Sequence, residues 1–263
     1  MTQGATTSAP VKIETAGRVA IIRMTAPSNH NALNVAMREA LMDAIRTVNE
    51  SAGLDGMVLT GNERTFCAGG DLRTMGQMTH AEGVSRIIGA QALPRSIHAS
   101  PKPVVAAVEG ICAGAGMALA AVCDLIVVGR GARFITSFEK VGLMPDLGAS
   151  CSVTARMGCQ AARRLFLLGG SLGAEEAQDS GLSDFLVEKG HAEVAATELV
   201  GRLSRLAPGA RHAVREVFRD PPATLEDAFR FEIAHQPGLY VSSDLQEGVA
   251  AFLEKREPNW RDV

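Results

Sequence analysis

Short apolar segments alternate with helical patterns along the first two hundred residues of the chain. Segments 11–15 and 19–24 predict two strands joined at Gly17, and Asn34 is placed to cap the helix that follows. The apolar stripe of that helix recurs at helical spacing and comprises Met37, Leu41, Ile45 and Val48. Apolar strands are also expected at 56–61, 103–108 and 124–128, and helices at 81–97 and 117–122. This alternation favours an α/β architecture with a parallel central sheet.

The pattern changes after about residue 200, where strand signals stop and helical patterns separated by Pro and Gly take over. These helical patterns cover 193–206, 209–218, 225–236 and 244–255. We therefore expect an α/β core over 11–200 and a helical C-terminal subdomain over 201–263. The first ten residues are small and polar, and they predict a disordered leader over 1–10 rather than a signal peptide.

Composition narrows the classes of function. Hydrophobic residues make up 46% of the 263 residues, which is ample for a large core, and the formal net charge is only −3. The lack of a long Lys/Arg run argues against nucleic-acid binding. The apolar runs are well short of the ~20 residues that span a bilayer, so no membrane association is expected. A cytoplasmic location is the expectation that follows.

Neither the cysteines nor the histidines are spaced as metal ligands. No C-x-x-C pair occurs among the five cysteines, and their small or apolar neighbours predict reduced, structural thiols. The five are Cys67, Cys112, Cys123, Cys151 and Cys159. The six histidines are scattered, so no metal site is expected. The chain also lacks the G-x-S-x-G nucleophile elbow and the Walker motif.

Two glycine-rich runs, at 66–72 and 110–119, carry the candidate chemistry. The second run lies between an expected strand and an expected helix, where unpaired amides around Gly114 form an anion site. Two such amides, one from each run, make an oxyanion hole. A turn that only allows strand and helix to pack closely is the alternative. A dinucleotide site is disfavoured, because Leu119 replaces the third small residue of G-x-G-x-x-G and no acidic residue follows about twenty positions later.

Four segments, in order and spacing, carry a resemblance to a known family. They are 27–34 (PSNHNALN), 66–72 (FCAGGDL), 102–110 (KPVVAAVEG) and 247–256 (EGVAAFLEKR). Through them the chain resembles the crotonase superfamily, the enoyl-CoA hydratase/isomerase family, from about residue 11 to 261. The resemblance implies a crotonase-like spiral of ββα units with two roughly perpendicular sheets, and a helical C-terminal trimerisation region. It also implies an acyl-CoA thioester substrate, no cofactor because coenzyme A is part of that substrate, and a homotrimer or hexamer.

By position in the family's motifs, the oxyanion amides fall on Gly70 and Ala115. There they hold the thioester oxygen as it gains enolate charge, which lowers the barrier for breaking a neighbouring C–H bond. An alanine at 115 supplies the same N–H as the more usual glycine. The resemblance also suggests further substrate-binding residues around the first run and near the C-terminus. These are Ala68, Asp71, His30, Leu33 and Lys255, of which Asp71 is expected mainly to order its loop.

The acid/base groups distinguish the reactions of this family. Enoyl-CoA hydratases hold water between two glutamates, and the corresponding positions here are Ala118 and Phe138. Neither side chain exchanges a proton, so both are expected to bind substrate by packing. Glu139 is adjacent but shifted by one residue, and a structural role is expected for it.

One carboxylate, Asp146, matches a catalytic position of the family. In the segment 141–148 (VGLMPDLG) it corresponds to the acid of isomerases that carry Gly-Leu-x-Pro-Asp, including phenylacetate-pathway isomerases. The alternative is that Asp146 caps a helix beginning near Leu147. Segment 149–151 departs from these relatives, which leaves the acyl group of the substrate open.

A single carboxylate suits a proton shuttle between the α and γ carbons of a thioester. The sequence therefore predicts an enzyme, an isomerase that converts 3-enoyl-CoA to 2-enoyl-CoA with Asp146 as its acid/base. An enoyl-CoA hydratase, which is a lyase, with replaced glutamates is the second hypothesis. A catalytically silent subunit that binds acyl-CoA is the third.

Overall fold

The structure is a computed structural model that describes residues 9–260. The chain divides into two compact units, Met1–Val200 and Gly201–Val263. The leader expected at 1–10 falls mostly on residues 1–8, which lie outside the described residues. None of the described helices is both long enough and apolar enough to cross a bilayer.

A six-stranded sheet forms the centre of the first unit. Its strand order is β1-β2-β3-β5-β7-β10, where β1 and β2 are antiparallel and every other neighbouring pair is parallel. The strands are β1 (Val11–Ala16), β2 (Val19–Met24), β3 (Gly56–Thr60), β5 (Val104–Val108), β7 (Leu125–Gly129) and β10 (Phe185–Val187). The expected hairpin, the three expected apolar strands and the parallel character of the sheet are confirmed. Strands β3 and β5 contain buried residues only, as continuous apolar runs do in a sheet covered on both faces.

A second sheet of four short strands has the order β4-β6-β8-β9. The strands are β4 (Thr65–Cys67), β6 (Ile111–Ala113), β8 (Arg133–Thr136) and β9 (Gly170–Gly173). In the chain, each of β3, β5 and β7 is followed by one strand of this second sheet and then by a helix. Three consecutive ββα units therefore build the core of the first unit. Cys67 and Cys112 are register partners on β4 and β6, and both are buried free thiols.

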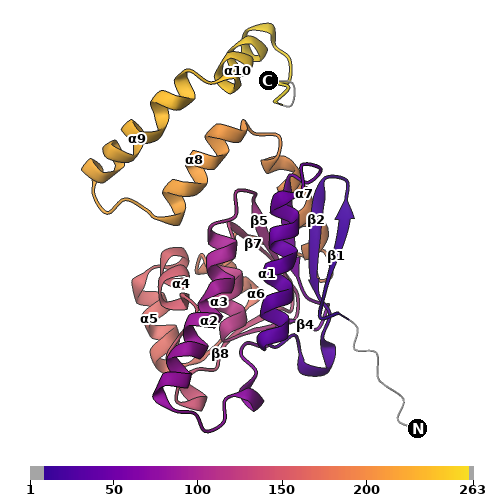
Figure 1. Cartoon of the computed structure of the whole chain (residues 1–263), viewed down its shortest axis with the longest axis vertical. Coiled ribbons are helices and arrows are strands. Elements are labelled where there is room, and N and C mark those ends of the chain that lie inside the picture. Colours follow the sequence, from indigo (N-terminus) through magenta and orange to yellow (C-terminus); the bar gives the residue numbers. More distant parts are fainter. Residues whose placement is uncertain (1–8, 261–263) are drawn as a thin grey trace. The chain divides into compact units, whose positions relative to one another are not determined.

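Helices surround the two sheets. They are α1 (Val35–Glu50), α2 (His80–His98), α3 (Ala115–Ala121), α4 (Ala149–Met157), α5 (Cys159–Leu168), α6 (Ala174–Asp179) and α7 (Ala192–Leu203), with 3-10 turns η1 (Pro27–Asn29), η2 (Leu72–Thr74) and η3 (Glu139–Val141). Helix α1 packs against β1, β2 and α2 (Figure 1). Asn34 caps it as expected, since its side chain accepts a hydrogen bond from the N–H of Met37 at 2.9 Å.

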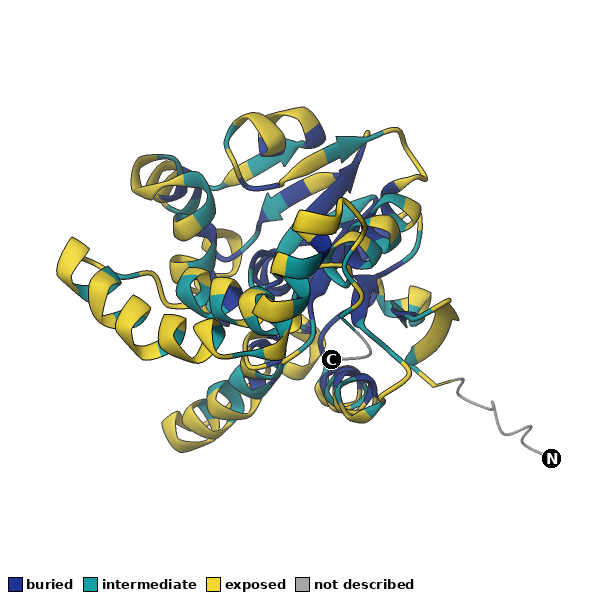
Figure 2. Cartoon of the chain, turned by 90° about the horizontal axis from the view of Figure 1, so that it is seen from above, coloured by how far each residue is buried: buried dark blue, intermediate teal, exposed yellow. Residues whose placement is uncertain are grey.

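The apolar core follows the patterns of the sequence. All four residues of the expected stripe on α1 are buried. They join one cluster with side chains from the strands and α3, including Leu59, Phe66, Val108 and Phe134. Figure 2 shows this arrangement, with buried residues concentrated on the central strands and exposed residues on the outer faces of the helices. Each such large side chain contributes about 1.5–3 kcal/mol when removed from water.

The second unit is helical, as expected. It contains α8 (Pro208–Arg219), α9 (Leu225–Tyr240) and α10 (Ser243–Glu254), coloured orange to yellow in Figure 1. Within the described part of these three helices, only Arg215 and Ala251 are buried. Large apolar side chains remain exposed, among them Phe218 and Phe252, at 77% and 83%. Such a surface is unusual for a monomer and is typical of one that is covered by another chain.

Candidate active site

The second glycine-rich run forms a sharp turn between β6 and α3. Gly114 has a φ of +50°, which suits glycine, and its N–H donates to the carbonyl of Ile135 at 2.8 Å. Ala115 is the first residue of α3. Because the first amides of a helix have no acceptor within the helix, the N–H of Ala115 makes no intrahelical hydrogen bond.

The first glycine-rich run lies directly against the second. A Cβ atom placed on Gly69, whose φ is +93°, would lie 2.8 Å from the carbonyl oxygen of Ala113 and 3.2 Å from the nitrogen of Ala115. A Cβ on Gly116 would overlap the carbonyl oxygen of Cys67. Only glycine permits backbones to approach so closely. These two glycines therefore have a packing role, and the same contact brings the two runs together.

Two amides remain available where the runs meet. Among the hydrogen bonds of residues 9–260, none uses the N–H of Gly70 or the N–H of Ala115 as its donor. The ε-methyl group of Met75 lies 2.6 Å from the position that a Cβ of Gly70 would take, so this side chain covers Gly70. A pair of unused backbone donors on adjacent loops is the basic requirement of an oxyanion hole.

Asp146 is the titratable group that stands out electrostatically. Within residues 9–260 its Oδ1 is buried and has no hydrogen-bond partner. Burial raises the pKa of Asp146 above its ordinary value of 3.8, while its own backbone N–H and the charge of Arg86 lower it in part. A half-buried carboxylate oxygen without a partner costs free energy, and titratable groups with shifted pKa values cluster at functional sites.

The alternative role of Asp146 as a helix cap is wrong. Helix α4 begins at Ala149, its N-cap residue is Gly148, and no side chain caps it. The backbone carbonyl of Asp146, and not its side chain, accepts from the N–H of Ala149 at 2.9 Å. Leu147 and Gly148 both adopt positive φ, at +52° and +82°, so the chain turns sharply after Asp146.

The two positions that the resemblance matches to hydratase glutamates are apolar in this structure. Phe138 is 7% exposed, and its ring Cζ lies 3.9 Å from where a Cβ of Gly114 would be, so it packs beside the turn that precedes Ala115. Ala118 is fully buried in the core cluster. Glu139 points elsewhere, because its Cδ atom lies 2.6 Å from the Cβ position of Gly169 at the end of α5.

The segment after Gly70 is ordered by Asp71. The carboxylate of Asp71 accepts from the N–H of Arg73 at 3.1 Å and from its guanidinium at 2.9 Å, and the pKa of Asp71 is lowered by this partner. Its carbonyl oxygen also accepts from the hydroxyl and the N–H of Thr74, at 2.7 and 3.0 Å. Both carboxylate oxygens of Asp71 are therefore engaged by Arg73, and Asp71 shapes the turn η2.

The remaining expected binding residues fall in two places. His30 and Leu33 border the first run, because the carbonyl of His30 accepts from the N–H of Ala68 at 3.0 Å and the N–H of Leu33 donates to Gly69 at 2.7 Å. Leu33 is 2% exposed and belongs to the core, whereas His30 is exposed. Lys255 lies in the second unit, exposed at the end of α10.

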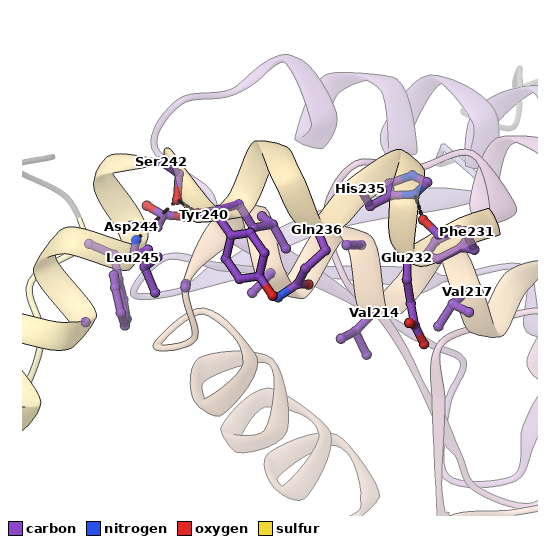
Figure 3. Close-up of a pocket in the computed structure, with 16 residues that line it drawn as sticks. Val214, Val217, Phe231, Glu232, His235, Gln236, Tyr240, Ser242, Asp244 and Leu245 are labelled. Carbon is purple, nitrogen blue, oxygen red and sulfur yellow. Dashed lines mark hydrogen bonds between the residues drawn. The ribbon is translucent and has the colours of Figure 1, made fainter. Parts of the chain in front are cut away.

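The second unit contains a cavity of about 480 Å³ between α8, α9 and α10 (Figure 3). Its lining is mostly apolar, and it includes His235, whose ring stacks on that of Phe231 at 3.9 Å between centroids. The His235 ring also bonds to the Phe231 carbonyl at 2.9 Å, as Figure 3 shows. No residue selected from the sequence as a site residue lines this cavity. The oxyanion candidates Gly70 and Ala115 lie instead in the first unit, where the two glycine-rich runs meet.

The family is decided by comparison with known proteins. The family model for enoyl-CoA hydratase/isomerase matches residues 14–263. The chain belongs to the enoyl-CoA hydratase/isomerase family. The 2,3-dehydroadipyl-CoA hydratase of Escherichia coli is 30% identical over 248 residues, covering 93% of this chain and 95% of that protein. The trans-2-decenoyl-(acyl-carrier-protein) isomerase of Streptococcus mutans is 29% identical over 247 residues, covering 92% and 94%.

Solved structures of the enoyl-CoA hydratase/isomerase family share the fold. The crystal structure of an enoyl-CoA hydratase from Polaromonas sp. JS666 superposes with a TM-score of 0.90 at 32% identity, covering 95% of this chain and 99% of that one. The expected crotonase-like fold is thus confirmed. No group of three or more His, Cys, Asp or Glu side chains within residues 9–260 is arranged to hold a metal ion.

The raised pKa of Asp146 predicts a pH-dependent cost to stability. Because the folded chain holds the proton more tightly than the unfolded chain, stability is lost as the pH rises through the folded-state pKa. Asp146→Asn should therefore melt at a higher temperature than the wild type at about pH 7.5, with the difference shrinking toward about pH 4. Thermal melts followed by circular dichroism measure this.

The matched control is Asp43→Asn, since Asp43 is an exposed carboxylate on α1 that pairs with Arg46. Exposed pairs contribute little, so this variant should show no such gain at neutral pH. Equal melting temperatures for wild type and Asp146→Asn at both pH values would contradict the prediction.

Proposed function

We propose that this chain is an acyl-CoA thioester isomerase that converts a 3-enoyl-CoA to a 2-enoyl-CoA, with Asp146 as the single acid/base. The observation that carries the proposal is the combination of one half-buried carboxylate, whose Oδ1 has no hydrogen-bond partner among the described residues, with apolar side chains at the two positions matched to the hydratase glutamates. Burial that raises the pKa of Asp146 suits a group that must both take and return a proton.

The reaction is an isomerisation, so the product has the same atoms and the same number of electrons as the substrate. Asp146 takes a proton from the α carbon, and the electrons of that C–H bond extend into a dienolate. The amides of Gly70 and Ala115 hold the thioester oxygen as it gains negative charge. Asp146 then returns the proton to the γ carbon, and the double bond ends between the α and β carbons. Both transfers use one carboxylate, so no second acid is required.

Water addition makes a different demand on the site. A hydratase must hold and activate a water molecule, and Phe138 and Ala118 offer no oxygen or nitrogen side-chain atom for it. The relatives include proteins named for both reactions, a hydratase in Escherichia coli and an isomerase in Streptococcus mutans. Hydration with a replaced base therefore stands as the second candidate.

We also propose that the chain assembles as a homotrimer or hexamer. The support is the set of exposed apolar side chains on the helices of the second unit. These include Leu225, Phe229, Ile233, Tyr240, Val249 and Leu253. Covering such a surface with a second copy removes it from water and stabilises the assembly.

Asp146→Asn tests the proposed function directly. The amide keeps the shape of the side chain and removes its basicity, so isomerisation of a 3-enoyl-CoA should fall by ~10²–10⁴-fold, the usual contribution of a positioned general base. Thioester binding should persist, because Gly70 and Ala115 use backbone amides. Product formation followed by mass spectrometry in deuterated water measures turnover and proton exchange together.

Asp43→Asn again serves as the control and should turn over like the wild type. Full turnover by Asp146→Asn would defeat the proposal and make Glu139 the next carboxylate to test. Tight binding with no turnover and no deuterium uptake in the wild type would instead identify a silent binding subunit.

The hydratase alternative is tested by restoring the missing carboxylates. Wild-type protein should add water to crotonyl-CoA far more slowly than it isomerises a 3-enoyl-CoA. The double variant Ala118→Glu with Phe138→Glu should gain hydratase activity, because two carboxylates then hold the water. A wild-type hydration rate equal to its isomerisation rate would show that the second candidate is the correct one.

The assembly is tested by light scattering. The wild type should have three or six times the mass of one chain at micromolar concentration. Phe218→Glu with Phe252→Glu should lower that mass, since each introduces a charge on an exposed apolar surface of the second unit. Ile13→Glu, at an exposed apolar position of β1 in the first unit, is the control. A monomeric wild type would disprove the assembly.

A further inference from the structure

One arginine joins helix α2 to the segment that follows Gly70. Arg86 is half-buried on α2, and its guanidinium donates two hydrogen bonds to Thr74, from Nη1 to the carbonyl oxygen at 3.2 Å and from Nη2 to the hydroxyl at 3.0 Å. Thr74 in turn donates from its hydroxyl and its N–H to the carbonyl of Asp71. Asp71 directly follows Gly70, so a continuous chain of hydrogen bonds connects α2 to the first oxyanion residue.

The same guanidinium acts on charged groups of three other segments. Its positive charge contributes to lowering the pKa of the Asp71 and Asp146 carboxyl groups. The pKa of Arg38 on α1 is lowered mainly by burial, and repulsion from Arg86 lowers it further. These groups come from parts of the chain far apart in sequence. The charge of Arg86 therefore acts on groups of α1, of the Gly70 segment and of the Asp146 turn.

Few charged groups act on Asp146 and Arg86. At Asp146, Arg86 is the charged side chain that opposes the effect of burial on the pKa. Arg86 in turn acts on the carboxylates of Asp71 and Asp146 and on the cation of Arg38. Asp71 has a bidentate contact with Arg73. At Asp146, Oδ1 has no hydrogen-bond partner among the described residues.

We propose that Arg86 is a positioning residue of the isomerase site, whose two hydrogen bonds to Thr74 tie the segment after Gly70 to α2. The inference rests on the proposed isomerase function. The tether restrains residues 70–75, which include Gly70 and Met75. The charge of the same guanidinium also opposes the effect of burial on the pKa of Asp146, so it favours the ionised carboxylate.

The experiment compares three variants on the same helix. Arg86→Gln removes both the charge and the guanidinium that donates two hydrogen bonds to Thr74. Arg86→Lys keeps the charge but lacks the planar two-donor geometry. Arg95→Gln is the matched control, since Arg95 is exposed on α2 and bonds only to Gln91, at 3.1 Å, one turn earlier. Circular dichroism melts establish that each variant is folded.

Two readouts separate the tether from the charge. The first is amide hydrogen exchange of residues 70–75 in the full chain without substrate. The second is the pH dependence of kcat/KM for a 3-enoyl-CoA. Arg86→Gln should exchange about fivefold or more faster in this segment, as loss of one net hydrogen bond implies. The acidic limb of the kcat/KM profile of Arg86→Gln should move to higher pH, because the pKa of Asp146 rises when the cation is lost.

Arg86→Lys should show the faster exchange while its acid limb stays near that of the wild type. Arg95→Gln should match the wild type in both measurements. Wild-type exchange in Arg86→Gln would overturn the tether, and an unmoved acid limb would overturn the role of the charge. Full turnover by Asp146→Asn would refute the isomerase mechanism instead, so the two failures are distinguishable.

Discussion

The close approach of two backbones is the constraint on which the site depends. Gly69 and Gly116 allow the runs after β4 and β6 to touch, and any side chain at either position would meet a main-chain atom of the other run. Each run belongs to a different ββα unit, so the contact joins two repeats of the fold. The proposed oxyanion hole is thereby built from peptide groups, which every residue type supplies. This leaves side chains such as Phe138 free to vary with the reaction.

The proposed site also depends on a half-buried carboxylate, Asp146, whose burial costs free energy that the fold tolerates. Asp146 precedes a sharp turn, and its Oδ1 has no hydrogen-bond partner among the described residues. Its own backbone N–H and the charge of Arg86 offset the effect of burial on its pKa only in part. Proteins that gain stability at functional positions commonly lose function there. The carboxylate and the two unused amides are thus the groups that the proposed function assigns to the substrate.

Much of the fold could be predicted from the sequence, because apolar residues recur at helical or strand spacing over long segments, and the structure has the expected elements there. The stripe of α1, the hairpin at Gly17 and the helical second unit all follow directly from such periods. The second sheet was expected only from the family resemblance, because its strands are three or four residues long, lie within or beside glycine-rich turns, and give no periodic signal of their own. Two of the three oxyanion and acid/base positions needed a family motif to be found. The link between Arg86 and Thr74 gave no sequence signal, because twelve residues separate them and neither belongs to a recognisable pattern.

The burial of the free thiols Cys67 and Cys112, which are neighbours on β4 and β6, has a practical consequence for chemical modification of this protein. Burial raises the pKa of Cys67 to about 12 and raises that of Cys112 as well, so neither thiol is ionised at neutral pH. Cys151 and Cys159 are exposed at the starts of α4 and α5. Alkylating reagents will therefore modify these two helices and spare the strands that lead into Gly70 and Ala115. A fluorophore or spin label can be attached next to the Asp146 turn with the natural sequence intact.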